Sequence, residues 1–209
     1  MQLISVNIGK PVPFEHTRPG VTGIFKIPVS GPVQVNTLGL EGDAIIDTAN
    51  HGGRDQAVYV YFREDYDWWE AELGRPLVPG TFGENLTISG MSSRGSLVGD
   101  RFTIGGVVLE VTSPRIPCRT FAARMEDKFF VKKFLAADRP GVYCRVLAEG
   151  QIESGTAVQF DRFAGAAVPV IEMCHSWNRS DLDDATIARY LAAPIHEKER
   201  QRWQKDLST

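Results

Sequence analysis

Cysteine is scarce in this chain, with Cys118, Cys144 and Cys174 among 209 residues. Such an odd and scattered set does not form a disulfide framework, so we expect a reducing, cytoplasmic location. No apolar run approaches the roughly 18 residues of a transmembrane helix, so no membrane partner is expected. Residues 1–10 contain neither a basic segment nor a sustained apolar segment, so we expect no secretion signal.

An excess of one charge is also missing. The chain has 23 Lys and Arg against 26 Asp and Glu, which gives a net charge of −3. A weakly acidic chain has no overall attraction to nucleic acid, so no nucleic-acid partner is expected. Hydrophobic residues make up 43% of the sequence and charged residues 23%, as in ordinary folded domains, which excludes a disordered chain.

The sequence motifs of several common enzymes are absent. We find no Gly-x-x-x-x-Gly-Lys, no His-Glu-x-x-His, no Cys-x-x-Cys and no Gly-x-Ser-x-Gly. Nucleotide hydrolysis, zinc proteolysis, thioredoxin-type exchange and serine hydrolysis therefore lack support. A cysteine cluster for iron–sulfur and a dinucleotide fingerprint are missing as well.

Short β-branched segments bounded by Gly or Pro dominate the first three quarters of the chain, at residues 33–36, 57–61, 101–104, 107–111 and 142–146. Gly105-Gly106 between two of them is typical of a two-residue hairpin. Many short strands at this spacing predict a mainly β fold, a barrel or a sandwich. We assign this β domain to residues 1–163.

Helical patterns are fewer. One helix is predicted at residues 64–73, ending at Gly74, and a second from Thr120 through Phe134 to Pro140. Residues 164–209 differ in character and predict three short helices, one with an acidic N-terminal cap at residues 180–183. We therefore expect a small C-terminal α-helical extension on the β domain.

The first candidate site lies in the glycine-rich residues 39–56. Because Gly42, Gly52 and Gly53 disfavour a helix, the four-residue spacing of its acidic and histidine side chains is interpreted as accidental. We interpret this segment as a turn-rich loop whose backbone approaches an anion, with Arg54 at its tip. The alternative is a set of capped turns between strands. The spaced side chains are Asp43, Asp47, His51 and Asp55.

The second candidate is Cys118, in a proline-stiffened loop just before a predicted helix. Arg115 and Arg119 flank it, and a helix N-terminus adds positive potential, so we expect its pKa to be lowered. It would then serve as a nucleophile or a soft-metal ligand, and a buried structural thiol is the alternative. Cys144 is in phase with valines and is predicted to be inert in the core.

Together these segments resemble the MOSC domain family, in particular its YiiM-like branch with a three-helix extension. Residues 39–61, with a Gly-Asp…Asp…His-Gly-Gly core, carry the resemblance most clearly, and family members often have Pro where this chain has Arg54. The other matching stretches are residues 23–33, 80–86, 99–102, 114–118 and 141–146.

The resemblance implies a MOSC-type β-barrel that binds the molybdenum cofactor (molybdopterin), with Cys118 as the protein ligand to the metal. His51 and Asp55 would position substrate or move protons. The candidate contacts to the pterin and its phosphate are Lys26, Arg54, Asn85, Arg115 and Arg119.

The resemblance also implies an oxidoreductase that reduces small N-hydroxylated compounds, such as hydroxylaminopurine-type base analogues. Since no electron-carrier motif is present, a separate reductase is expected to supply electrons. One alternative is a carrier that holds a persulfide or the molybdenum cofactor on Cys118 for delivery. Another treats the helical extension as a protein-docking module on a passive scaffold.

Overall fold

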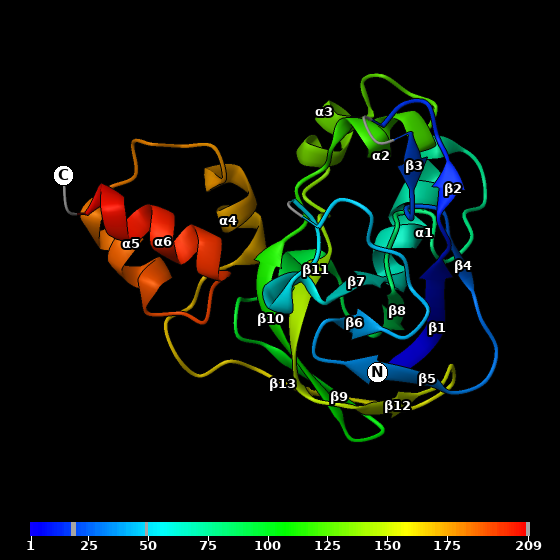
Figure 1. Cartoon of the computed structure of the whole chain (residues 1–209). Coiled ribbons are helices and arrows are strands. Elements are labelled where there is room, and N and C mark those ends of the chain that lie inside the picture. The colour runs from blue at the N-terminus through cyan, green and yellow to red at the C-terminus, as the bar shows by residue number, and fades with distance from the viewer. Residues whose placement is uncertain (18–19, 49, 208–209) are drawn as a thin grey trace.

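The structure is a computed structural model that describes residues 1–17, 20–48 and 50–207. These residues form a mixed α/β fold with one large sheet, two small sheets and six α-helices (Figure 1). Along the large sheet the strand order is β13 (Val158–Asp161), β9 (Arg101–Ile104), β10 (Val107–Pro114), β11 (Val142–Ala148), β7 (Val58–Phe62), β8 (Leu86–Ser89), β1 (Gln2–Gly9) and β4 (Lys26–Pro28).

The small sheets are built from short strands. One contains β12 (Gly150–Ile152), β5 (Val33–Asn36) and β6 (Gly39–Leu40), and the other pairs β2 (Val12–Pro13) with β3 (Val21–Thr22). Among the described residues, β7 pairs with β8 in parallel and the other paired strands are antiparallel. The predicted hairpin at Gly105-Gly106 joins β9 to β10, and both glycines have positive φ, as a type I′ turn requires.

Strand pairing does not show the predicted closed barrel. The pairing of the large sheet ends at β13 on one side and at β4 on the other. β4 contains Pro28, which has no N–H to donate to a further strand. β1 meets the segment before β13 through a single isolated bridge, between Gln2 and Ala157. This bridge is not a continuous ladder of hydrogen bonds. The prediction of a strand-rich chain holds, but the fold is mixed α/β.

The first predicted helix is confirmed as α1 (Arg63–Leu73), which ends at Gly74 with φ of 65°. The single helix predicted from Thr120 to Phe134 is wrong, because the chain forms α2 (Arg119–Arg124) and α3 (Phe130–Ala136). Glu126 has a positive φ of 55° between them. Asp127 then accepts a hydrogen bond at 2.8 Å from the N–H of Phe129, which is the N-cap residue of α3.

The C-terminal part contains the three predicted helices, α4 (Val170–Ser176), α5 (Asp184–Leu191) and α6 (Glu197–Asp206). The acidic cap of α5 is confirmed, since Asp183 accepts from the Thr186 N–H at 2.8 Å. Within the described ranges, no helix combines the length and the apolar character that crossing a lipid bilayer requires.

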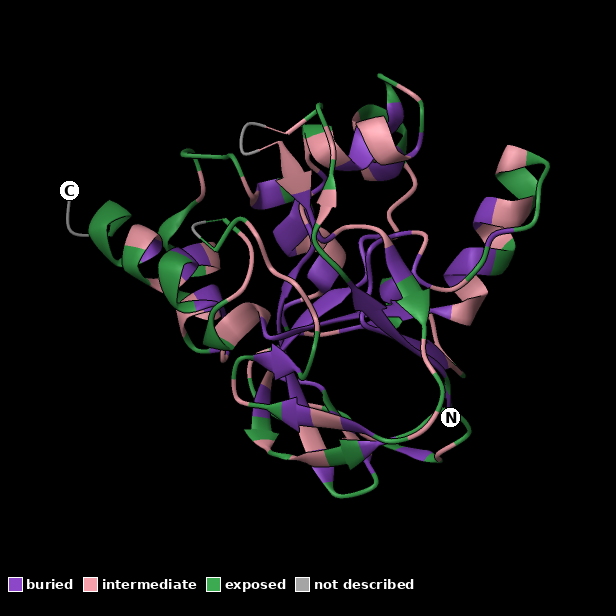
Figure 2. Ribbon diagram, turned by 45° about the vertical axis from the view of Figure 1, so that its right-hand side comes forward, coloured by how far each residue is buried: buried purple, intermediate pink, exposed green. Residues whose placement is uncertain are grey.

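Buried side chains form two clusters, and the buried segments gather at the strands in Figure 2. The larger cluster joins the sheets to the C-terminal helices through Val170, Ile187 and Trp203. Cys144 lies in it, fully buried as predicted, and burial raises its pKa far above that of an ordinary thiol. The second cluster is largely aromatic and packs α1, α2 and α3 against the other face of β7. It therefore holds the start of α2 in place beside the sheet.

Candidate functional site

A cavity of about 1370 Å³ opens beside the start of α2. It is larger than the roughly 300–1,000 Å³ of common ligand pockets, so it has room for a cofactor together with a small substrate. Six of the residues predicted from the sequence line it, although they come from four separate segments of the chain: Lys26, His51, Asn85, Arg115, Cys118 and Arg119.

Cys118 occupies the N-cap position of α2 in extended conformation. Burial alone would raise the pKa of its thiol. The hydrogen bond with His51, the positive charge of Arg115 and the backbone N–H of Phe121 together lower it to about 6. The sulfur is therefore mostly thiolate at neutral pH, which agrees with the predicted reactive or metal-binding role rather than an inert core thiol.

Arg115 supplies a buried positive charge in the cavity wall. Only 4% of the residue is exposed, and its guanidinium lies over the rings of Tyr59 and Phe121, at 5.2 and 4.2 Å from their centroids. Among the described residues, its Nη1 has no hydrogen-bond partner. A buried guanidinium N–H without an acceptor is costly, so this side of the cavity suits a ligand with an anionic or carbonyl oxygen.

Lys26 and Asn85 also line the cavity, but protein groups already engage them. Lys26 forms a buried ion pair with Asp43, and burial lowers the pKa of its ammonium group against the opposing effect of that carboxylate. Asp43 also accepts from the Asn85 side-chain amide at 2.9 Å and from the Gly9 N–H at 2.7 Å. Asn85 in turn accepts from the Tyr59 N–H at 3.1 Å. These contacts make the group a rigid part of the wall.

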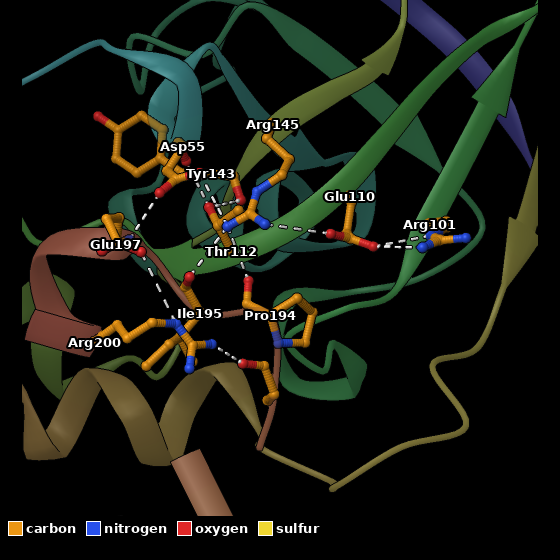
Figure 3. A network of polar contacts seen from close by, with 11 residues as sticks. Asp55, Arg101, Glu110, Thr112, Tyr143, Arg145, Pro194, Ile195, Glu197 and Arg200 are labelled. Carbon is orange, nitrogen blue, oxygen red and sulfur yellow. Dashed lines mark hydrogen bonds and ion pairs between the residues drawn. The ribbon is translucent and has the colours of Figure 1, made fainter. Parts of the chain in front are cut away.

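Asp55 and Arg54 do not line the cavity. They belong to the 3-10 helix η1 (Arg54–Gln56), where Arg54 is exposed and Asp55 contacts Arg145 and the C-terminal helices (Figure 3). The interpretation of the regular Asp and His spacing as accidental is confirmed, because the chain from Asp43 to Gly53 forms no helix in its described residues. In the same described ranges, no three His, Cys, Asp or Glu side chains converge as a metal site would need.

Sequence reasoning missed several residues of the cavity. Tyr59 and Tyr143 alternate with buried core residues along β7 and β11, and this alternation could have placed them on the opposite face. Gln56 lines the cavity with a buried Oε1 that has no partner in the described part of the chain. His16 also lies at the cavity, and no pattern around it in the sequence points there.

The other two histidines, His175 and His196, have structural partners. His175 hydrogen-bonds to Asp138 at 2.7 Å. His196 caps α6, because its Nδ1 accepts from the Lys198 N–H at 3.0 Å. Cys174 is buried, which raises its pKa to about 12. These three side chains therefore contribute to the packing of the C-terminal helices and not to the cavity.

Comparison with known proteins identifies the family. The MOSC domain family model matches residues 47–159, a range that includes His51 and Cys118. The uncharacterized protein YflK of Bacillus subtilis is 39% identical over 158 residues, which are 75% of this chain and 72% of YflK. A protein named Reductase from Gibberella moniliformis is 34% identical over 143 residues, 66% of this chain but 25% of that protein.

The crystal structure of YiiM from Geobacillus stearothermophilus has a TM-score of 0.80 and 30% identity, covering 99% of this chain and 98% of that one. The chain therefore belongs to the MOSC domain family. The likeness to YiiM covers the sheets and the C-terminal helices alike, so the predicted YiiM-like character is confirmed.

Proposed function

We propose that this protein binds the molybdenum cofactor in the cavity, with Cys118 as the protein ligand to the metal, and reduces N-hydroxylated compounds. Membership of the MOSC family supports the class of cofactor. The observation that carries the proposal is the low-pKa thiol of Cys118 beside the unpartnered Nη1 of Arg115, within one large cavity.

The residues present fit this cofactor. A thiolate is a soft ligand of the kind that molybdenum in a sulfur-rich environment accepts. The Arg115 Nη1 would donate to a phosphate or pterin oxygen, and the Gln56 Oε1 would accept from a pterin N–H. Arg119 is exposed at the cavity and adds a positive charge for the phosphate. Lys26 and Asn85 would keep the wall in shape through Asp43.

When bound, the cofactor would supply two-electron oxygen-transfer chemistry. Reduction of R–NHOH to R–NH₂ and water consumes two electrons and two protons, and the protein must deliver the protons. His51 lines the same cavity as Cys118 and favours its thiolate, so it is the side chain best placed to hold a proton near the ligand sulfur. The buried rings of Tyr59 and Tyr143 would limit the access of water to that side.

A separate reductase would supply the electrons, since the sequence contains neither an iron–sulfur cysteine cluster nor a dinucleotide fingerprint. The relative named Reductase supports an oxidoreductase, and this chain matches a quarter of its length. We place the reaction in the cytoplasm, where reductants keep thiols such as Cys118 reduced.

The test is turnover of 6-hydroxylaminopurine with a reduced viologen dye, using protein expressed in a host that makes the cofactor. We expect wild type and the control Cys174→Ser to form the amine, and Cys118→Ser to lose at least about a hundredfold in rate. A wild type that holds cofactor or persulfide but gives no turnover would contradict the reductase and favour a carrier.

A further inference from the structure

Positive charge gathers on the segment that forms α2 and α3. Residues 119–136 contain five Lys and Arg against two acidic residues, which gives a net charge of +3, whereas the whole chain carries −3. The rest of the chain therefore carries −6, since the two parts sum to −3. Figure 1 shows α2 and α3 side by side, at the opposite end of the molecule from β9 and β12. This segment is thus a basic surface element on an otherwise acidic protein.

Phe129 is exposed in the middle of this segment. Its exposed fraction is 61%, and among the described residues it is the aromatic member of the large apolar side chains that face solvent. The Lys128 Nζ lies 5.0 Å from the centroid of its ring. Lys132 is exposed as well and follows Phe129 by three residues, the spacing of neighbours on a helix surface. An exposed aromatic ring therefore lies beside two ammonium groups.

The two acidic residues of the segment leave these ammonium groups unneutralised. Asp127 forms an ion pair with Lys133 at 2.7 Å and accepts from the Phe129 N–H. Glu126, in the turn between α2 and α3, is exposed and adds one negative charge. Within the described ranges, neither Lys128 nor Lys132 has a carboxylate partner. Two positive charges beside Phe129 are therefore available to a partner.

The same surface borders the cavity that contains Cys118. Lys128 lines the cavity, as does Val131 on α3. α2 begins directly after Cys118, and its six residues span roughly 9 Å at 1.5 Å per residue. The turn between α2 and α3 is therefore one short helix away from the thiol. A protein bound at Phe129 would lie beside the cavity on the side of α2.

The proposed function needs a protein that brings electrons to this cavity. Such a carrier must approach closely and dissociate again, and encounters of this kind use small interfaces. Aromatic side chains are enriched at the centre of interfaces, and charges at the rim speed association with a partner of opposite charge. Phe129 with Lys128 and Lys132 has this composition, and its charge favours an acidic partner.

We propose that Phe129, Lys128 and Lys132 form a docking surface for a ferredoxin-type electron carrier with acidic side chains around its redox group. Two reduced carriers, each oxidised by one electron, would supply the two electrons that R–NHOH and two protons consume to give R–NH₂ and water. The role of the carrier rests on the proposed function, whereas docking itself needs no bound cofactor.

The experiment measures the Kd of a plant-type [2Fe–2S] ferredoxin for the cofactor-free full chain by isothermal titration calorimetry at low salt. We expect wild type to bind, and the double variant Lys128→Glu/Lys132→Glu to bind at least about tenfold more weakly. The control Lys198→Glu/Lys205→Glu, at exposed positions of α6, changes the net charge equally and should leave Kd within about twofold.

Phe129→Ala is the second variant and should weaken binding by roughly fivefold or more, because it removes the apolar centre without changing the charge. A folded wild type that binds no ferredoxin, or equal weakening in both double variants, would overturn the proposal. Tighter binding of a single-stranded oligonucleotide would overturn it too, since it would assign the surface to nucleic acid. Turnover with the viologen dye but no ferredoxin binding would reject the docking surface alone, and ferredoxin binding without turnover would reject the reductase alone.

Discussion

His51, from the glycine-rich loop before η1, and Cys118, at the start of α2, line the same cavity, and His51 lowers the pKa of the Cys118 thiol. The two candidate segments of the sequence are therefore parts of one site. His51 thus favours the thiolate form of Cys118 and gives the cavity a side chain that can exchange protons.

The pKa of Cys118 is the first quantity to measure. Its alkylation rate in the cofactor-free protein should rise with pH to a plateau with a midpoint near 6, because His51, Arg115 and the Phe121 N–H favour the thiolate despite burial. His51→Gln should move the midpoint upward. Cys174, whose pKa is raised to about 12, should stay unreactive at neutral pH. A midpoint near 8.5, the value of an unperturbed thiol, would refute this description of the site.

The ion pair between Lys26 and Asp43 makes a prediction about stability. Both side chains are buried, with 8% and 4% exposed, so Lys26→Met leaves an unpaired carboxylate in the wall. We expect the free energy of unfolding in urea to fall by about 3–5 kcal/mol, and the added change Asp43→Asn to restore part of it. Arg179→Gln, which breaks an exposed pair with Asp181, should cost less than about 1 kcal/mol. If Lys26→Met lowers the free energy of unfolding no more than Arg179→Gln does, the buried ion pair does not contribute to stability as described here.

Glu84 predicts a pH dependence of stability. It is fully buried, and burial raises the pKa of its carboxyl although Tyr66, Thr87 and the Gly80 N–H hydrogen-bond to it. The folded state therefore binds the proton more tightly than the unfolded state. This contribution is complete below the unfolded pKa of 4.5 and is lost as pH rises through the higher folded pKa.

Relative to Glu84→Gln, the wild type should thus lose stability as the pH rises above 4.5, measured as the free energy of unfolding in urea at several pH values. Taking the difference between the two proteins removes the contributions of other carboxyl groups that they share. A difference that does not change with pH would mean that Glu84 has the same pKa in both states.

Trp203 on α6 should stabilise the whole chain and not only the C-terminal helices. It is fully buried against Tyr190, with 4.7 Å between ring centroids, and belongs to the same hydrophobic cluster as the strands. Trp203→Ala should cost about 3–5 kcal/mol, and circular dichroism of the sheet should show an earlier unfolding midpoint. Leu207→Ala, at a position 41% exposed, is the control. If the midpoint of the sheet stays unchanged, the two parts unfold independently.

The sequence predicted the reactive thiol because its causes lie close by in the chain. Arg115 precedes Cys118 by three residues and α2 begins directly after it, so charge and backbone act locally. The C-terminal helices and α1 were predictable for a similar reason, since their caps and periodic apolar residues are local signals.

What the sequence could not provide was the direction of side chains in irregular segments. His51 and Asp55 lie four residues apart, yet His51 lines the cavity together with Cys118 whereas Asp55 forms an ion pair with Arg145 outside it. His16 reaches the cavity through tertiary contacts of a segment without periodicity. The break between α2 and α3 had a weak local signal in Asp127, whose side chain accepts from the N–H of Phe129 just before α3, but the aromatic pattern continued through it.

The most direct test of cofactor binding at Cys118 is the molybdenum and pterin content per chain, after expression in a host that makes the cofactor. Wild type and the control Cys174→Ser should each contain close to one equivalent of metal and of pterin. Cys118→Ser should lose the metal or change its absorption spectrum. A folded wild type without molybdenum or pterin, or a Cys118→Ser variant that holds both with an unchanged spectrum, would contradict Cys118 as the metal ligand in this cavity.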